Sequence, residues 1–476
     1  MKQPDPSPSA SSDDSAAHLA RFVAEATYED LPAPVRDMAK RCLLDTLGVT
    51  IAASTLGIGH QALDRMARQP GGLPECTVLG FGGRLPLWHA ALVNGAMARA
   101  VDFDDSHDES MTHPSSVVVP AALAMAERRG GVNGRDLITA IAVGNEVLCR
   151  LGLAIARRPG GLKLDTWFPT SVFGAFGGIA ACGKVLGFDA PLMRSAFGIV
   201  MFEASGTLEA FSSTGQQGMM RGMITGLTAK AATLTATMAE HGITGVPDSI
   251  DGEFGLYRVY YGGSYDRPTL LADLGKRFES VDIGMKPWPT CRYTHSYIDA
   301  TLQLAGDADL QADSIDKIRL FVAGYAESRC VPLDQQRAPH NYNHAGHALP
   351  FLVAMAVVHR QVTMHSLLSM REDPQILALA QRVEPVHDAR FSAENRVGPS
   401  RIEIDLRGGG TLIKQLDHVY GGPSQPVSWD DLVSKFRGCV AHSARALAPA
   451  TVDGLIDRIA RLEDVTDVRA LLEAYH

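Results

Sequence analysis

The sequence lacks the basic excess and the cysteine pattern of several large protein classes. Its 476 residues contain 44 Lys and Arg against 53 Asp and Glu, a formal net charge of −9, so a basic face that binds nucleic-acid phosphates is not expected. The seven cysteines are odd in number and form no CxxC pair. This usage is typical of reduced thiols in the cytoplasm and argues against a zinc or iron–sulfur site.

The sequence also lacks long apolar runs. Residues 1–15 are rich in Pro, Ser and Asp and contain no apolar core, which predicts a disordered N-terminal tail and not a signal peptide. No uninterrupted apolar stretch of about 18 residues occurs, so we expect no membrane span.

What the sequence does have is a large apolar fraction, 46%, arranged with helical spacing. Residues 16–272 are rich in Ala, Gly and Leu, and in 35–51 the apolar residues recur with a period close to that of an α-helix. Helices with so many small residues pack closely and are buried on more than one side. Residues 16–272 are therefore predicted to form a helical domain.

Residues 273–422 predict a smaller α+β domain, inserted into the helical body or following it. Two stretches, 313–322 and 401–406, alternate wholly or in part like β-strands, and Gly408–Gly410 predicts the turn of a hairpin. Residues 423–476 return to helical patterns. The predicted fold class is mainly α, with a large all-helical domain plus a smaller α+β domain.

The densest polar cluster lies between Asp102 and His113. Five acidic residues and two histidines occur here, directly before an apolar run at 117–126 that predicts a buried helix. Acidic and imidazole groups at the mouth of a buried helix are suited to acid–base chemistry. A solvated turn between helices would have a similar composition, and this alternative stays open.

Two further segments combine polar groups with helix starts. In 167–174, Thr170 or Ser171 is predicted to cap a Gly-rich helix whose free N–H groups could bind an anion; the alternative is an ordinary N-cap. In 211–222, Arg221 opens an apolar helix and could clamp a carboxylate. The alternative for Arg221 is a buried salt bridge or a solvated helix end.

The segment 286–295 carries Lys286, Arg292 and His295 on a loop stiffened by two prolines, just before a predicted helix. Cations at a helix N-terminus add to the positive end of its dipole and favour anion binding. The alternative is an exposed basic loop. Histidines at 340, 344 and 347 would share one face of a helix, but no carboxylate accompanies them, so a metal is not expected there.

Taken in order, these segments resemble the MmgE/PrpD family, whose activities include 2-methylcitrate dehydration, cis-aconitate decarboxylation and iminodisuccinate epimerisation. The matching segments are 43–48, 91–95, 102–107, 113–116, 144–147, 173–177, 183–187, 286–295, 347–351 and 428–436. The resemblance implies a helical domain completed by the C-terminal helices, a smaller α+β lid, a homodimer, and a reaction that needs neither a metal nor an organic cofactor.

The resemblance also implies roles for individual residues. Asp102, Ser106 and His113 match loop residues near the reacting carbons. Lys286 matches a substrate-binding lysine of the lid. Cys291 or His295 falls near the active-site histidine of the lid.

The chain departs from the family pattern at four positions. Phe168 stands where a histidine is common, and Arg221 stands where lysine is usual. Arg99 and Ile224 occupy places that histidine often holds. The two arginines keep positive charge available for an anionic substrate.

We therefore predict a cytoplasmic, cofactor-independent lyase, a dehydratase or decarboxylase, that acts on a small di- or tricarboxylate. His113, oriented by Asp102, would transfer a proton at the carbon alpha to a carboxylate, with His295 as a further catalytic group. The predicted substrate-binding residues are Ser106, Arg221, Lys286, Arg292, Arg99 and Thr170. Cations must stabilise the enediolate that forms.

Three alternatives remain. An epimerase or isomerase acting on an iminodisuccinate-like acid is favoured by Phe168, because epimerisation needs no acid for a leaving group. A catalytically silent carboxylate-binding protein would keep the cations without the missing histidine. A metal-dependent phosphohydrolase would use His107 and Asp108 together with the histidines of 340–347.

Overall fold

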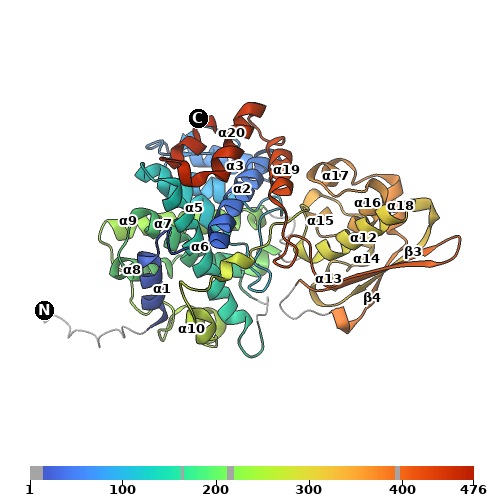
Figure 1. Cartoon of the computed structure of the whole chain (residues 1–476), viewed down its shortest axis with the longest axis horizontal. Coiled ribbons are helices and arrows are strands. Elements are labelled where there is room, and N and C mark those ends of the chain that lie inside the picture. Colours follow the sequence, from blue (N-terminus) through green and yellow to red (C-terminus); the bar gives the residue numbers. More distant parts are fainter. Residues whose placement is uncertain (1–13, 162–165, 212–218, 392–396, 476) are drawn as a thin grey trace. The chain divides into compact units, whose positions relative to one another are not determined.

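The computed structural model describes residues 14–161, 166–211, 219–391 and 397–475. Most of the predicted N-terminal tail lies outside these residues. Asp14, at its end, caps helix α1 (Ser15–Glu25) by accepting a hydrogen bond from the N–H of Ala17. The chain divides into two compact units (Figure 1): a helical unit, residues 1–100, 110–283 and 432–476, and an α+β unit, residues 101–109 and 284–431.

The helical unit is built from helices that pack on several sides. Its longer helices are α2 (Ala33–Leu56), α4 (Leu87–Met97), α5 (Ser115–Arg129), α6 (Gly134–Ala156), α7 (Pro169–Leu186), α8 (Ala190–Val200) and α9 (Met220–Glu240). The shorter elements are α3 (His60–Arg68), α10 (Leu256–Tyr261), α11 (Arg267–Leu271), α20 (Pro449–Ala460) and the hairpin of β1 (Cys76–Thr77) and β2 (Arg84–Leu85). Helix α7 contacts α5, α6 and α9, so it lies at the centre of the core.

Glycine permits the close approach of α6 and α7. A Cβ atom on Gly144 would come 2.8 Å from the carbonyl oxygen of Gly177, and one on Gly177 would come 2.7 Å from the carbonyl oxygen of Gly144. Glycine lowers helix propensity, but it is needed here because the two backbones approach closely. Tertiary packing therefore stabilises these helices.

Two of these helices could cross a membrane by length and composition alone, namely α6 and α7, and the bent pair α2–α3 could make a third span. The apolar windows of α6 and α7 are 100% and 89% buried inside the fold, as expected for core helices. The apolar stretches of these helices are interrupted by polar residues, and the absence of a membrane span stays a prediction.

The α+β unit contains a four-stranded sheet in the order β4-β3-β5-β6. Its strands are β3 (Ile315–Val322), β4 (Val383–His387), β5 (Ser400–Leu406) and β6 (Thr411–Leu416). Strands β3 and β4 are parallel, and β3, β5 and β6 are antiparallel neighbours. The predicted strands and the hairpin through Gly408–Gly410 are confirmed, as is the mainly α fold class with a smaller α+β part.

Helices cover one face of this sheet. Helix α12 (His295–Asp307) contacts β5 and β6, and α16 (Leu349–His359) contacts β4, α12 and α18 (Pro374–Ala380). Shorter helices complete the crossover from β3 to β4: α13 (Gly324–Ser328), α14 (Leu333–Arg337), α15 (Tyr342–Ala345) and α17 (Met364–Ser369). Inward residues such as Ile402 and Ile404 are fully buried. Alternate residues carry charges, including the ion pair of Arg319 and Glu403 at 2.9 Å.

The unit boundaries differ from the predicted 273 and 422. Residues 273–283 pack in the helical unit because the buried ion pair of Arg150 and Glu146 holds their backbone. Arg150 Nη2 donates to the carbonyl of Arg277 at 2.7 Å, and the Glu146 carboxylate accepts from the N–H groups of Glu279 and Ser280. The α+β unit also includes residues 101–109, which the sequence prediction placed in the helical domain.

Candidate active site

The polar loop 101–109 is fixed to the backbone that precedes Lys286. The N–H of Ser106 donates to the carbonyl of Gly284 at 2.9 Å, and the N–H of Gly284 donates back to Ser106 at 2.7 Å. A Cβ atom on Gly284 would lie 2.4 Å from the carbonyl oxygen of Gly421, so only glycine allows this approach. Asp102 has φ +52°, a left-handed conformation that Asp tolerates better than most residues.

Lys286 is a buried cation held by the polar loop. Its side chain is 1% exposed, and its ammonium donates to Asp102 Oδ1 at 2.7 Å and to the Asp102 carbonyl at 2.9 Å. Asp104 Oδ1 lies 3.9 Å from the same nitrogen. A buried ammonium requires such compensation, because leaving it without a nearby negative charge would be costly.

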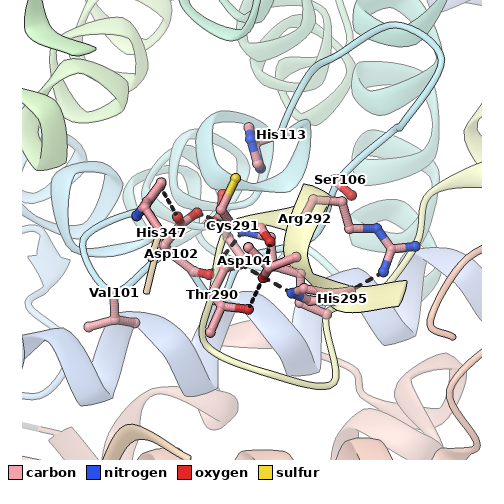
Figure 2. Close-up of polar contacts among 12 residues, drawn as sticks. Val101, Asp102, Asp104, Ser106, His113, Thr290, Cys291, Arg292, His295 and His347 are labelled. Carbon is pink, nitrogen blue, oxygen red and sulfur yellow. Dashed lines mark hydrogen bonds and ion pairs between the residues drawn. The ribbon is translucent and has the colours of Figure 1, made fainter. Parts of the chain in front are cut away.

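The second oxygen of Asp102 contacts His347 (Figure 2). The distance from His347 Nε2 to Asp102 Oδ2 is 3.0 Å, and His347 Nδ1 lies 2.7 Å from the carbonyl oxygen of Asn343. We call Lys286, Asp102, Asp104 and His347 the Lys286 cluster. His347 was considered at the sequence level only as a metal ligand and as part of a matching motif.

The three histidines of 340–347 do not share a helix face, because α15 spans only Tyr342–Ala345. His340 and His344 contact each other, with their Nδ1 atoms 2.9 Å apart, whereas His347 faces Asp102. Burial lowers the pKa of His344, and the neighbouring His340 lowers it further. Within the described ranges, no group of three or more His, Cys, Asp or Glu side chains is arranged to hold a metal ion.

Arg292 is already engaged with a carboxylate of the same loop. Its Nε lies 3.2 and 3.1 Å from the two oxygens of Asp108, which also accepts a hydrogen bond from Ser106 Oγ at 2.7 Å. Its Nη1 donates to the carbonyl of Tyr420 at 2.9 Å. Arg292 and Ser106, both predicted to bind substrate, are thus hydrogen-bonded to the side chain of Asp108. The sequence analysis names Asp108 only in the phosphohydrolase alternative.

His295 is fully buried at the start of α12. Its Nδ1 lies 3.3 Å from Arg292 Nη1, which can only donate, so Nδ1 accepts and Nε2 donates to the carbonyl of Thr290 at 3.2 Å. Burial lowers the pKa of His295 well below its usual value, and the charges of Arg292 and Lys286 lower it further. His295 is therefore a neutral imidazole with both nitrogens engaged.

Cys291, the other candidate near the lid histidine of the family, is half-buried on the same loop. Its N–H donates to the carbonyl of Gly346 at 2.8 Å. This contact ties the loop carrying Arg292 to the segment that carries His347.

In the helical unit, the structure brings His113 and Thr170 together. The N–H of His113 donates to Thr170 Oγ1 at 3.0 Å, which fixes the backbone just before α5. The prediction that Thr170 or Ser171 caps α7 is wrong. The N-cap is Phe168, without a side-chain hydrogen bond, and Pro169 is the first helical residue because its ring favours that position.

Arg99 and Arg221, also in the helical unit, share an aromatic surface. The guanidinium carbon of Arg99 lies 5.3 Å from the ring centre of Phe168 and 5.9 Å from that of Phe211. That of Arg221 lies 5.2 Å from Phe211, and the two rings are 4.6 Å apart. Phe168 thus replaces the expected histidine with a packing surface for a cation. Residues 212–218 of this segment lie outside the described part of the chain.

The predicted site residues therefore form two sets, each within one unit. The α+β unit holds Asp102, Ser106, Lys286, Arg292 and His295, and the helical unit holds His113, Thr170, Arg99 and Arg221. Sequence reasoning missed the contacts of His347 and Asp108. The matching segment 347–351 was the signal that could have identified His347.

The two units define a mainly helical protein in two parts, with a buried ionic cluster in the smaller part. The models of the MmgE/PrpD N-terminal domain and C-terminal domain match residues 17–268 and 288–456. The chain belongs to the MmgE/PrpD family, as its motifs predicted.

Similar proteins of known activity cover nearly the same length. The chain is 25% identical to a cis-aconitate decarboxylase of Aspergillus terreus over 96% of this chain and 95% of the relative. It is 29% identical to the human cis-aconitate decarboxylase, over 91% and 88%. It is 22% identical to a mitochondrial 2-methylcitrate dehydratase of Yarrowia lipolytica, over 81% and 75%. The protein is an enzyme of the lyase class, of the MmgE/PrpD type.

Proposed function

We propose that the protein is a cofactor-independent dehydratase or decarboxylase that acts on a small di- or tricarboxylate by proton transfer alpha to a carboxylate. The observation that carries this proposal is the buried ammonium of Lys286, held by Asp102 on a loop rich in acidic groups. The relatives named cis-aconitate decarboxylase support it, and cis-aconitate is therefore the first substrate to test. Cofactor independence rests on the family resemblance.

The proposed chemistry needs a fixed cation. In a decarboxylation, the carbon–carbon bond to one carboxylate breaks and carbon dioxide leaves. The electron pair enters the enediolate of a remaining carboxylate, and a proton is added to carbon. In a dehydration, the alpha proton is removed, and hydroxide leaves with a proton as water. Both pass through an electron-rich carboxylate, which a preorganised ammonium in a water-poor site stabilises.

In this proposal the site residues have separate roles. Lys286 pairs with the substrate carboxylate whose charge increases, and Asp102 fixes the position of the ammonium. His113 is the proposed proton-transfer group, with its backbone held by Thr170. Arg99 and Arg221 are proposed as the cations for a further carboxylate. Arg292, Ser106 and His295 support the loops of the α+β unit through Asp108 and Thr290.

The test is proton NMR in D₂O with cis-aconitate, citrate, 2-methylcitrate, iminodisuccinate and malate. An itaconate-like product with loss of one carboxyl carbon would establish a decarboxylase, and new olefinic signals from a hydroxy acid would establish a dehydratase. Lys286→Met should lose this activity. Lys317→Met is the matched control, because Lys317 also pairs with a carboxylate, Glu384 at 3.0 Å, but is 41% exposed on the sheet. Equal activity of the two variants would contradict the role of Lys286.

An epimerase of the same family is a second candidate, and Phe168 favours it. Its ring packs against Arg99 and Phe211 and offers no proton to a leaving group. Deuterium incorporation without net conversion in the same assay would identify this activity. Carboxylate binding by calorimetry without exchange or conversion would identify a binding protein.

We also propose a cytoplasmic homodimer. Large apolar side chains are exposed on the helical unit, including Phe202 at 79% and Phe254 at 78%, and a second copy would cover such surface. The free cysteines are compatible with a reducing compartment. Light scattering of the purified protein would measure the mass, and a monomer at micromolar concentration would contradict the dimer.

A further inference from the structure

His347 is bonded on both sides to groups that accept hydrogen bonds. A peptide carbonyl accepts and cannot donate, so the 2.7 Å contact with Asn343 requires a proton on His347 Nδ1. The 3.0 Å contact between Nε2 and Asp102 Oδ2 requires a second proton between these two atoms. A neutral imidazole carries only one N–H, so it cannot satisfy both contacts unless Asp102 is protonated.

The second proton resides on the imidazole. The ordinary pKa of a histidine is about 6.5 and that of an aspartic acid about 3.9, so in a pair the proton prefers the ring. The ammonium of Lys286, 2.7 Å from the other oxygen of Asp102, favours the ionised carboxylate still more.

The charges of the Lys286 cluster support this assignment. With His347 as an imidazolium, the two cations, Lys286 and His347, balance the two carboxylates, Asp102 and Asp104. With a neutral His347, these four side chains would sum to a charge of −1. A partly buried carboxylate is less costly to hold beside an opposite charge than beside a neutral ring.

We propose that His347 is a positioning residue, held as an imidazolium between the Asn343 carbonyl and the Asp102 carboxylate. It fixes the Asp102 carboxylate so that its other oxygen orients the ammonium of Lys286. For its effect on turnover, this inference rests on the proposed function. Loss of one charge-assisted hydrogen bond would lower kcat by about 10- to 100-fold, with a smaller change in KM.

The first test needs no substrate. In protein labelled with ¹⁵N-histidine, one histidine should show both ring nitrogens protonated at neutral pH, and His347→Gln should remove that signal. Asp102→Asn should convert the same histidine to a neutral ring, because the carboxylate that stabilises the imidazolium is gone. A neutral His347 in the wild-type protein, or an unchanged signal in Asp102→Asn, would overturn the proposal.

The second test measures turnover of the substrate found above. His347→Gln should lower kcat, whereas His340→Gln is the matched control, because His340 is exposed on the same segment and contacts only His344 among the interactions described above. Wild-type kcat in His347→Gln would overturn the positioning role while leaving the proposed function intact. If the wild-type protein turns over no acid, the proposed function fails, and the NMR test still decides the protonation state.

Discussion

Replacing Lys286 separates its structural role from its chemical one. Lys286→Met removes a cation that is 1% exposed and leaves Asp102 and Asp104 beside an apolar side chain. Removing one partner of a buried ion pair typically costs about 3–5 kcal/mol. Asp102 is 16% exposed, so water can reach it and the lower end of this range is expected. The same variant should lose turnover by about 100-fold or more, as with other preorganised groups that stabilise an anion.

The double variant Lys286→Met/Asp102→Asn distinguishes the two roles. It removes both charges of the closest pair, so urea unfolding should show about 1–3 kcal/mol of stability regained relative to Lys286→Met alone. Turnover should remain lost, because the amide cannot replace the ammonium. A double variant no more stable than the single one would refute the ion pair as the source of the loss. Activity regained in the double variant would refute the chemical role of Lys286.

Three further predictions concern the supports of the site and the core. Acidification from neutral pH should destabilise the protein through His295: its pKa is lowered in the fold, so its contribution to stability is present above about pH 6.5 and is lost as pH falls below that value. Thermal melts at pH 7.5 and 5.5 should therefore differ less in His295→Gln than in the wild type, and an equal difference would contradict the neutral buried ring. Arg292→Lys keeps the charge, but an ammonium cannot reach both Asp108 and the Tyr420 carbonyl as the guanidinium does. The free energy of unfolding in urea should therefore fall by about 1–3 kcal/mol. An unchanged unfolding midpoint would argue against these contacts. In the helical core, Gly226→Val should lower the melting temperature severely, because a Cβ atom would lie 2.2 Å from the Leu92 carbonyl oxygen. Gly438→Val is the control and should lower it less, because a Cβ atom there would meet open space. Similar effects of both variants would contradict the close approach of α4 and α9.

The family and the mainly α fold could be predicted because they depend on repeated or ordered signals. Small residues at helical spacing predict closely packed helices, and Gly144 and Gly177 show why those residues are small. The hairpin around Gly408–Gly410 follows from local alternation and a turn, which need no knowledge of distant contacts.

The contacts of the site could not be predicted, because they join segments that are far apart in the chain. The pairing of His347 with Asp102 follows from the short length of α15, which directs His347 away from His340 and His344. Arg292 is predicted to bind a substrate carboxylate, and no local sequence signal indicates that its guanidinium pairs with Asp108. The predicted N-cap of α7 was wrong for a local reason. Pro169 occupies the first helical position, so Phe168, the residue before it, is the N-cap.

The most direct test of the central claim is the fate of solvent deuterium during turnover of cis-aconitate in D₂O. Proton transfer to carbon predicts release of carbon dioxide and one deuterium bound to carbon in the product, observed by proton NMR and mass spectrometry. A decarboxylated product that carries no carbon-bound deuterium, or no conversion and no deuterium exchange with any acid of the panel, would contradict it.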